Sequence, residues 1–328
     1  IRTNILADTD ALYLTAIDKY GHELWRWTFP VNKLNQQTEQ LSPLSSRPTY
    51  TETENDLTVK ANKRTFIFSK KDGQLKGVSV DNRKINFANG PRFIGARRAD
   101  RSLDQFYNHD DEKAKEKDRT YSEFPDAAVF TKLDVKEDGG NLVVTANYKL
   151  GNLDKAQWTI NPSGDLALDY TYNFSGVVDL MGIRFDYPED QVISKRWLGA
   201  GPYRVWQNRI HGTQYDVWEN DYNDPIPGET FTYPEFKGYF GDVSWMNIQT
   251  KEGTISLTNE TPDTYIGVYQ PRDGRDRLLY TLPESGISVL NVIPPVRNKV
   301  NSTDLCGPSS QPKWVNGPQT GRVIFRFM

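Results

Sequence analysis

Residues 141–150 read NLVVTANYKL, and residues 155–174 read KAQWTINPSGDLALDYTYNF. In both stretches apolar and aromatic residues alternate with polar ones over short runs, and Gly, Asn, Asp and Pro mark the junctions. Alternation with a period of two indicates strands that bury one face, and closely spaced turn residues indicate antiparallel connections. These stretches therefore predict neighbouring strands of an antiparallel sheet.

The same pattern extends in both directions. Residues 57–87 contain three short apolar runs, with KKDGQ at 70–74 and DNR at 81–83 in hairpin positions. Residues 192–201, 253–260 and 321–328 repeat it as VISKRWLGAG, GTISLTNE and GRVIFRFM. Strands of this length at this spacing predict an all-β chain whose residues 57–328 form one large antiparallel sandwich.

The N-terminal region predicts a separate unit. ALYLTAID at 11–18 and ELWRWTFPV at 23–31 both alternate, with KYGH as the turn between them. Two strands cannot bury a hydrophobic face alone. We therefore expect residues 1–34 to be the last strands of a preceding, immunoglobulin-like β-sandwich, in a piece of a longer protein. Residues 35–56, rich in Ser, Thr and Pro, are the predicted linker.

Composition narrows the classes of function. The 328 residues are 37% hydrophobic with a net charge of −3, which predicts a packed core and no nucleic-acid or membrane partner. Cys306 is the only cysteine, and there are three histidines, so we expect no disulfide framework, metal site or cofactor. Any targeting signal would lie upstream of Ile1. The compartment therefore stays open between the bacterial cytoplasm and a periplasmic or secreted location.

Three segments, in this order along the chain, resemble the last domain of family-2 glycoside hydrolases of the β-galactosidase type. Residues 66–102 include a hairpin followed by GPRFIGARRADRS, which is similar to the opening hairpin and R-A-P-x-D-N-D loop of that domain. Residues 197–203, WLGAGPY, resemble its W-x-G-x-G-P segment, and Arg209 keeps the arginine of the D-R pair that follows. Residues 232–248, TYPEFKGYFGDVSWMNI, resemble its next strand.

The resemblance implies a β-supersandwich of the galactose-mutarotase type over residues 57–328. It also implies a role. The catalytic glutamates of the family lie on an upstream TIM barrel, so this chain is expected to be non-catalytic, with that barrel as its partner. The domain would brace the barrel and help to complete its carbohydrate cleft. The parent is expected to hydrolyse glycosides, while the chain alone has no catalytic residues.

Candidate binding residues lie in two predicted loops. Residues 201–224 interleave aromatic rings, which can stack on the apolar face of a sugar, with charged groups that can bind its hydroxyls. Residues 297–312 lie where relatives place residues that face the cleft. The candidate contacts for a mono- or oligosaccharide are Tyr203, Arg204, Trp206, Arg209, Trp218, Asn301 and Asp304.

Other functions stay open at this point. The aromatic residues of 201–224 could instead pack the loop onto the sandwich, which would make the chain a scaffold without a ligand. Exposed rings would favour a free-standing carbohydrate-binding module. His211, with Glu219 and Glu235 nearby in the sequence, leaves open an aldose 1-epimerase, which needs a histidine acid and a carboxylate base.

Overall fold

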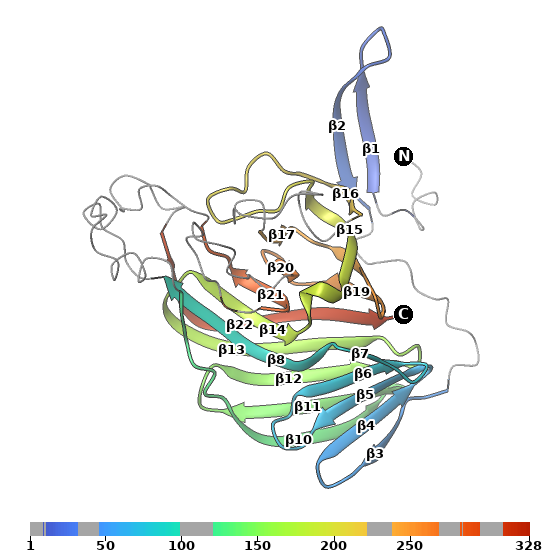
Figure 1. Ribbon diagram of the computed structural model, residues 1–328, viewed down its shortest axis with the longest axis vertical. Helices are drawn as coiled ribbons and strands as arrows, with labels where there is room; N and C mark the ends of the chain where they lie inside the picture. The colour runs from blue at the N-terminus through green and yellow to red at the C-terminus, as the bar shows by residue number, and fades with distance from the viewer. Residues whose placement is uncertain are drawn as a thin grey trace.

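The computed structural model describes residues 9, 11–31, 46–98, 121–221, 238–268, 283, 285–295 and 311–328. Within these ranges the secondary structure is antiparallel β-sheet, apart from one short 3-10 turn at Glu189–Gln191. Most of the strands belong to two large sheets that face each other (Figure 1). The prediction of an all-β supersandwich is confirmed.

The first sheet has nine strands in the order β10-β11-β12-β13-β22-β19-β18-β15-β16, and we call it the β13 sheet. Its central pair, β13 and β22, runs without a register shift from Leu166 opposite Phe325 to Val178 opposite Lys313. Its strands are β10 (Val129–Asp138), β11 (Asn141–Lys149), β12 (Leu153–Ile160), β13 (Leu166–Val178), β15 (Val192–Gly201), β16 (Gln214–Asn220), β18 (Trp245–Thr250), β19 (Gly253–Asn259) and β22 (Lys313–Phe327).

The second sheet has eleven strands and is called the β8 sheet. Its main path runs β17-β20-β21-β14-β8-β6-β5-β4-β3, with β7 paired to β6 and β9 paired to β8. Its strands are β3 (Thr49–Glu52), β4 (Asp56–Ala61), β5 (Arg64–Ser69), β6 (Leu75–Val80), β7 (Arg83–Ile85), β8 (Ala88–Arg98), β9 (Tyr121–Glu123), β14 (Leu180–Asp186), β17 (Phe240–Gly241), β20 (Tyr265–Val268) and β21 (Ile287–Val292).

The main core fills the space between the sheets. On β13, Leu168, Tyr170 and Tyr172 are buried, while the residues between them face outward. An aromatic cluster joins the layers, with Phe87 stacked on Phe185 at 4.7 Å between ring centroids and Phe325 packed against both. Full burial of one such side chain contributes about 1.5–3 kcal/mol, so these alternating positions dominate the stability of the fold.

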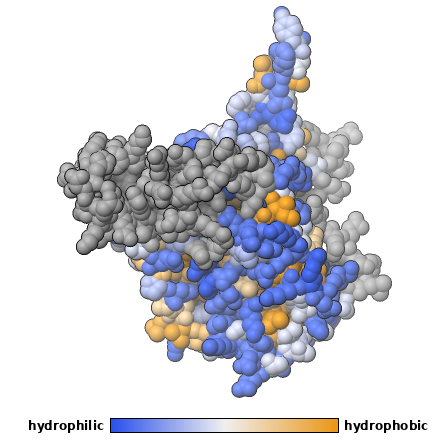
Figure 2. Space-filling model, viewed as in Figure 1, coloured by the Kyte–Doolittle hydropathy of each residue, from blue (hydrophilic) through white to orange (hydrophobic). Residues whose placement is uncertain are grey.

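A two-stranded hairpin projects from this body (Figure 1). Its strands are β1 (Ala11–Ile17) and β2 (Glu23–Pro30), as the sequence pattern predicts. One face is apolar, because the register places three small or aliphatic residues opposite three aromatic ones. These pairs are Leu12–Phe29, Leu14–Trp27 and Ala16–Trp25. Much of this face is exposed, and Figure 2 shows an apolar patch on the hairpin.

The other face of the hairpin contacts β16. The hydroxyl of Tyr13 donates to a carboxylate oxygen of Asp216 at 2.5 Å, and a guanidinium nitrogen of Arg26 lies 4.0 Å from the other oxygen. Burial, together with the Asp216 carboxylate, raises the pKa of Tyr13 to about 12. The hairpin is therefore fastened to the sandwich through one nearly buried carboxylate.

Three boundaries differ from the expectations. Residues 49–52 of the predicted linker form β3, residues 214–220 of the predicted loop form β16, and β22 begins at Lys313 rather than near 321. Residues 49–52 and 313–320 are exposed or only half-buried, and β16 is an edge strand, so buried apolar residues give only a faint periodic signal in these segments. Residues 35–45 of the linker lie outside the described residues, and the domain division stays a prediction.

Candidate functional site

The connection from β15 to β16, residues 202–213, begins in a tight contact. A Cβ atom on Gly201 would lie 2.4 Å from the Trp218 ring, so only glycine lets that ring pack across β15. The indole nitrogen of Trp218 donates to the carbonyl oxygen of Gln214 at 3.0 Å. Trp218 lies at the base of the loop. Its side chain is half-buried, so part of the Trp218 ring remains open to solvent.

Trp206 anchors this loop onto the β8 sheet. Its ring is 2% exposed and packs edge-on against Tyr239 at 5.5 Å between centroids. Together they belong to a second apolar cluster, distinct from the main core. The other members are Ile94, Ala96, Leu180, Val205, Leu290 and Ile293. The ring of Trp206 therefore has no free face on which a sugar could stack, because packing, not solvent, surrounds it.

The neighbouring candidates are more accessible. Tyr203 is 69% exposed, and Arg209 is exposed as well. Arg204 is half-buried, with its guanidinium 5.2 Å from the centre of the Phe240 ring, a cation–π distance. Tyr203, Arg204 and Arg209 are thus the candidate residues of this connection that present aromatic or charged groups to solvent.

Gln207 connects the two predicted loops. Its backbone N–H donates to the carbonyl oxygen of Pro294 at 3.1 Å, and its side-chain amide donates to that of Gln311 at 2.7 Å. Pro294 and Gln311 flank the segment that contains Asn301 and Asp304, two candidates that lie outside the described residues. The bases of both loops therefore meet at one buried glutamine.

A hollow of ≈ 420 Å³ lies beside β16, between the end of the hairpin and the β19–β20 turn. Tyr215 and Ser244 share a hydrogen bond of 2.6 Å on its wall. Its acidic lining residues, Asp242, Glu260 and Asp263, offer acceptors for hydroxyl groups. Burial raises the pKa of the adjacent Tyr265, and the carboxylates of Asp242 and Asp263 raise it further.

Sequence reasoning missed Gln207 and this hollow. Neither has a local signature, because each depends on residues far apart in the chain, such as Gln207 and Gln311, which are 104 positions apart. Among the described residues there is no group of three or more His, Cys, Asp or Glu side chains placed to hold a metal ion. Within the same residues, no helix has the length and apolar character needed to cross a membrane.

One protein family and several solved structures are similar to this chain. The model of the family "Beta galactosidase small chain" matches residues 60–293. A galactose 1-epimerase from Lactobacillus acidophilus covers 86% of this chain and 99% of its own, at 10% identity and a TM-score of 0.46. A GalM/aldose epimerase homologue from C. elegans covers 85% and 99%, at 7% identity and a TM-score of 0.38. A search among curated proteins finds no match to this sequence.

Proposed function

Because this chain belongs to the β-galactosidase small chain family, we propose that it is the non-catalytic, C-terminal part of a family-2 glycoside hydrolase. In this role the supersandwich braces a catalytic TIM barrel, and the 202–221 region forms one wall of the carbohydrate cleft. The reaction proposed for the parent is hydrolysis of a β-galactoside, with both catalytic carboxylates on the barrel.

The double contact of Gln207 carries this proposal. It gathers the bases of the 202–213 connection and of the segment after Pro294 at one end of the sandwich. Loops held on a rigid sheet are the usual means of presenting a binding surface. Tyr203, Arg204 and Arg209 then supply a ring and cationic donors for sugar hydroxyls or for the barrel itself. A single wall would bind a monosaccharide weakly, with a dissociation constant of about a millimolar.

The exposed apolar face of the hairpin supports a further part of the proposal. Trp25 and Trp27 are 51% and 45% exposed, and Leu14 is 57% exposed. Such a face is normally covered in a soluble protein. A preceding immunoglobulin-like sandwich would cover it, with β1 and β2 as its last strands.

The described histidines do not favour an epimerase. His211 and His22 are both exposed, and His22 pairs with Asp18 at the hairpin turn. An aldose 1-epimerase would hold its histidine inside a sugar pocket, opposite a carboxylate.

Hydrogen exchange of this chain, alone and mixed with the separately expressed barrel, tests the bracing role. We expect slower exchange at residues 202–221 in the mixture, and a smaller effect in the double variant Tyr203→Ala, Arg209→Ala. Tyr50→Ala, at a ring 43% exposed on β3, is the matched control and should behave as wild type. Protection confined to β3 and β4, or none at all, would contradict the proposal.

A further inference from the structure

The outer face of the β13 sheet carries a track of mostly polar side chains along β13 and β22. Because the two strands pair without a register shift, their outward side chains lie directly opposite one another. The pairs are Asp169–Arg322, Thr171–Thr320, Asn173–Pro318, Ser175–Asn316 and Val177–Trp314. Lys155 and Gln157 extend the track onto β12, opposite Thr171 and Asp169. Over these positions the track is about 27 Å long at the rise of an antiparallel strand.

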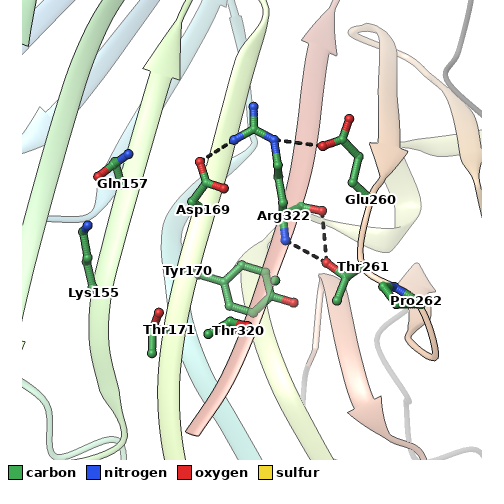
Figure 3. Close-up of a pocket in the computed structure, with 11 residues that line it drawn as sticks. Lys155, Gln157, Asp169, Tyr170, Thr171, Glu260, Thr261, Pro262, Thr320 and Arg322 are labelled. Carbon is green, nitrogen blue, oxygen red and sulfur yellow. Dashed lines mark hydrogen bonds and ion pairs between the residues drawn. The ribbon is translucent and has the colours of Figure 1, made fainter.

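A shallow hollow of ≈ 390 Å³ forms one end of the track (Figure 3). On its wall, the guanidinium of Arg322 lies between the carboxylates of Asp169, at 2.5 Å, and Glu260, at 2.9 Å. Thr261 secures the same residue, since its hydroxyl accepts from the backbone N–H of Arg322 at 2.7 Å. The ion pairs therefore shape the hollow before any ligand arrives.

The hollow is lined by polar side chains that have no hydrogen-bond partner among the described residues. The side chains of Gln157, Thr171 and Thr320 line the hollow, and the described residues give none of them a hydrogen-bond partner. The charges around them balance, with Lys155 and Arg322 against Asp169 and Glu260. A balanced, polar and open surface suits a neutral ligand with many hydroxyl groups better than it suits an anion or a cation.

The other end of the track carries an exposed aromatic ring. Trp314 is 71% exposed, while its neighbour Val315 packs against the core, so the Trp314 ring points outward. An indole face is a stacking platform for the C–H face of a pyranose. Trp314 also follows Gln311 by three residues, so this end of the track lies next to the loop bases gathered by Gln207.

We propose that this track binds a neutral, extended oligosaccharide. One part of the ligand would lie in the 390 Å³ hollow beside Arg322, and another sugar ring would stack on Trp314. The site is separate from the residues assigned to the cleft and does not require the barrel. A long oligosaccharide bound along the track would extend toward the 202–213 connection. The protein would therefore bind polymeric substrates more tightly than monomeric ones.

Amide NMR shifts of the isolated chain test this proposal, with galactose and with galacto-, xylo- and cello-oligosaccharides of increasing length as probes. We expect shifts on β12, β13 and β22 for at least one series, with affinity that rises with length. Trp314→Ala should weaken binding about tenfold, whereas Tyr20→Ala, at a comparably exposed ring in the hairpin (73%), should leave it unchanged.

Several outcomes would overturn the assignment. Shifts confined to residues 202–213 would place the sugar at the cleft wall and leave the function proposed above standing. No shifts with any of the three series, or tighter binding of oligogalacturonate than of the neutral chains, would each reject the neutral-oligosaccharide track. Concentration-dependent shifts of the track without sugar would mark it as a protein interface. Failure of the chain to associate with a barrel would not affect this result.

Discussion

The side-chain amide of Gln207 lies 2.7 Å from the carbonyl oxygen of Gln311, to which it donates a hydrogen bond across 104 residues of sequence. Gln207 is 6% exposed, so water cannot readily replace this bond. The same residue holds Pro294 through its backbone N–H. One residue, through its side chain and its backbone, thus contacts both connections where they leave the sandwich.

Replacing Gln207 should loosen this junction. In Gln207→Ala the carbonyl oxygen of Gln311 loses a donor in a poorly hydrated place, at a cost of about 1–3 kcal/mol in the free energy of unfolding. Urea denaturation measures the change. Gln157→Ala removes the same side chain from the outer face of the sheet and should cost less than about 0.5 kcal/mol. Equal effects of the two substitutions would show that the Gln207 contacts contribute nothing.

A buried and an exposed tryptophan should contribute very differently to the free energy of unfolding. Trp206→Ala empties the centre of the second apolar cluster and should cost about 3–5 kcal/mol, because the loss of buried contacts adds to the cavity left behind. Trp314→Ala removes the same side chain at 71% exposure and should change stability by less than about 0.5 kcal/mol. Midpoints of urea unfolding at unchanged slope provide the comparison. A stable Trp206→Ala would mean that the loop is not anchored through this ring.

Particular strands show what the sequence could and could not predict. The regular alternation around β11 to β13 predicts strands at the observed places because each of these strands buries one face at every second residue. The β1 and β2 runs alternate apolar and polar residues in the same way and also form strands, although their apolar face is largely exposed. The outward residues of β13, Asp169, Thr171, Asn173 and Ser175, could have been recognised from the same alternation as a polar track. The contacts of Gln207, and Arg322 between two carboxylates, could not, since they depend on the pairing of distant strands.

The contact between Tyr13 and Asp216 should respond to alkaline pH. The folded state raises the Tyr13 pKa from 10.0 to about 12, so its neutral phenol is favoured. The hydrogen bond from Tyr13 to Asp216 therefore stabilises the docked hairpin fully below pH 10. This stabilisation is lost as the pH rises toward 12. Carbon NMR of labelled tyrosine, assigned with Tyr13→Phe, measures the midpoint.

In Asp216→Asn the midpoint should fall yet remain above 10.0, because burial is the largest cause of the shift. A wild-type midpoint at the ordinary tyrosine value would show that the hairpin is not docked on β16.

The predicted linker provides a test of the domain division. Residues 49–52 pair with β4, so a protease should cut before β3, within residues 35–48. Mass spectrometry of early fragments after mild treatment with endoproteinase Glu-C, which can cleave after Glu39, locates the cut. First cleavage inside the sandwich, with 35–48 intact, would argue against a boundary there.

The central claim is that this chain assists a catalytic barrel and performs no chemistry alone. Its most direct test is kcat/KM for a nitrophenyl β-galactoside, measured for the barrel alone, for this chain alone, and for the two mixed. The account predicts no turnover by this chain and a higher kcat/KM for the mixture than for the barrel alone. Equal values with and without the chain would contradict it, as would turnover by the isolated chain that a single Asp or Glu substitution abolishes.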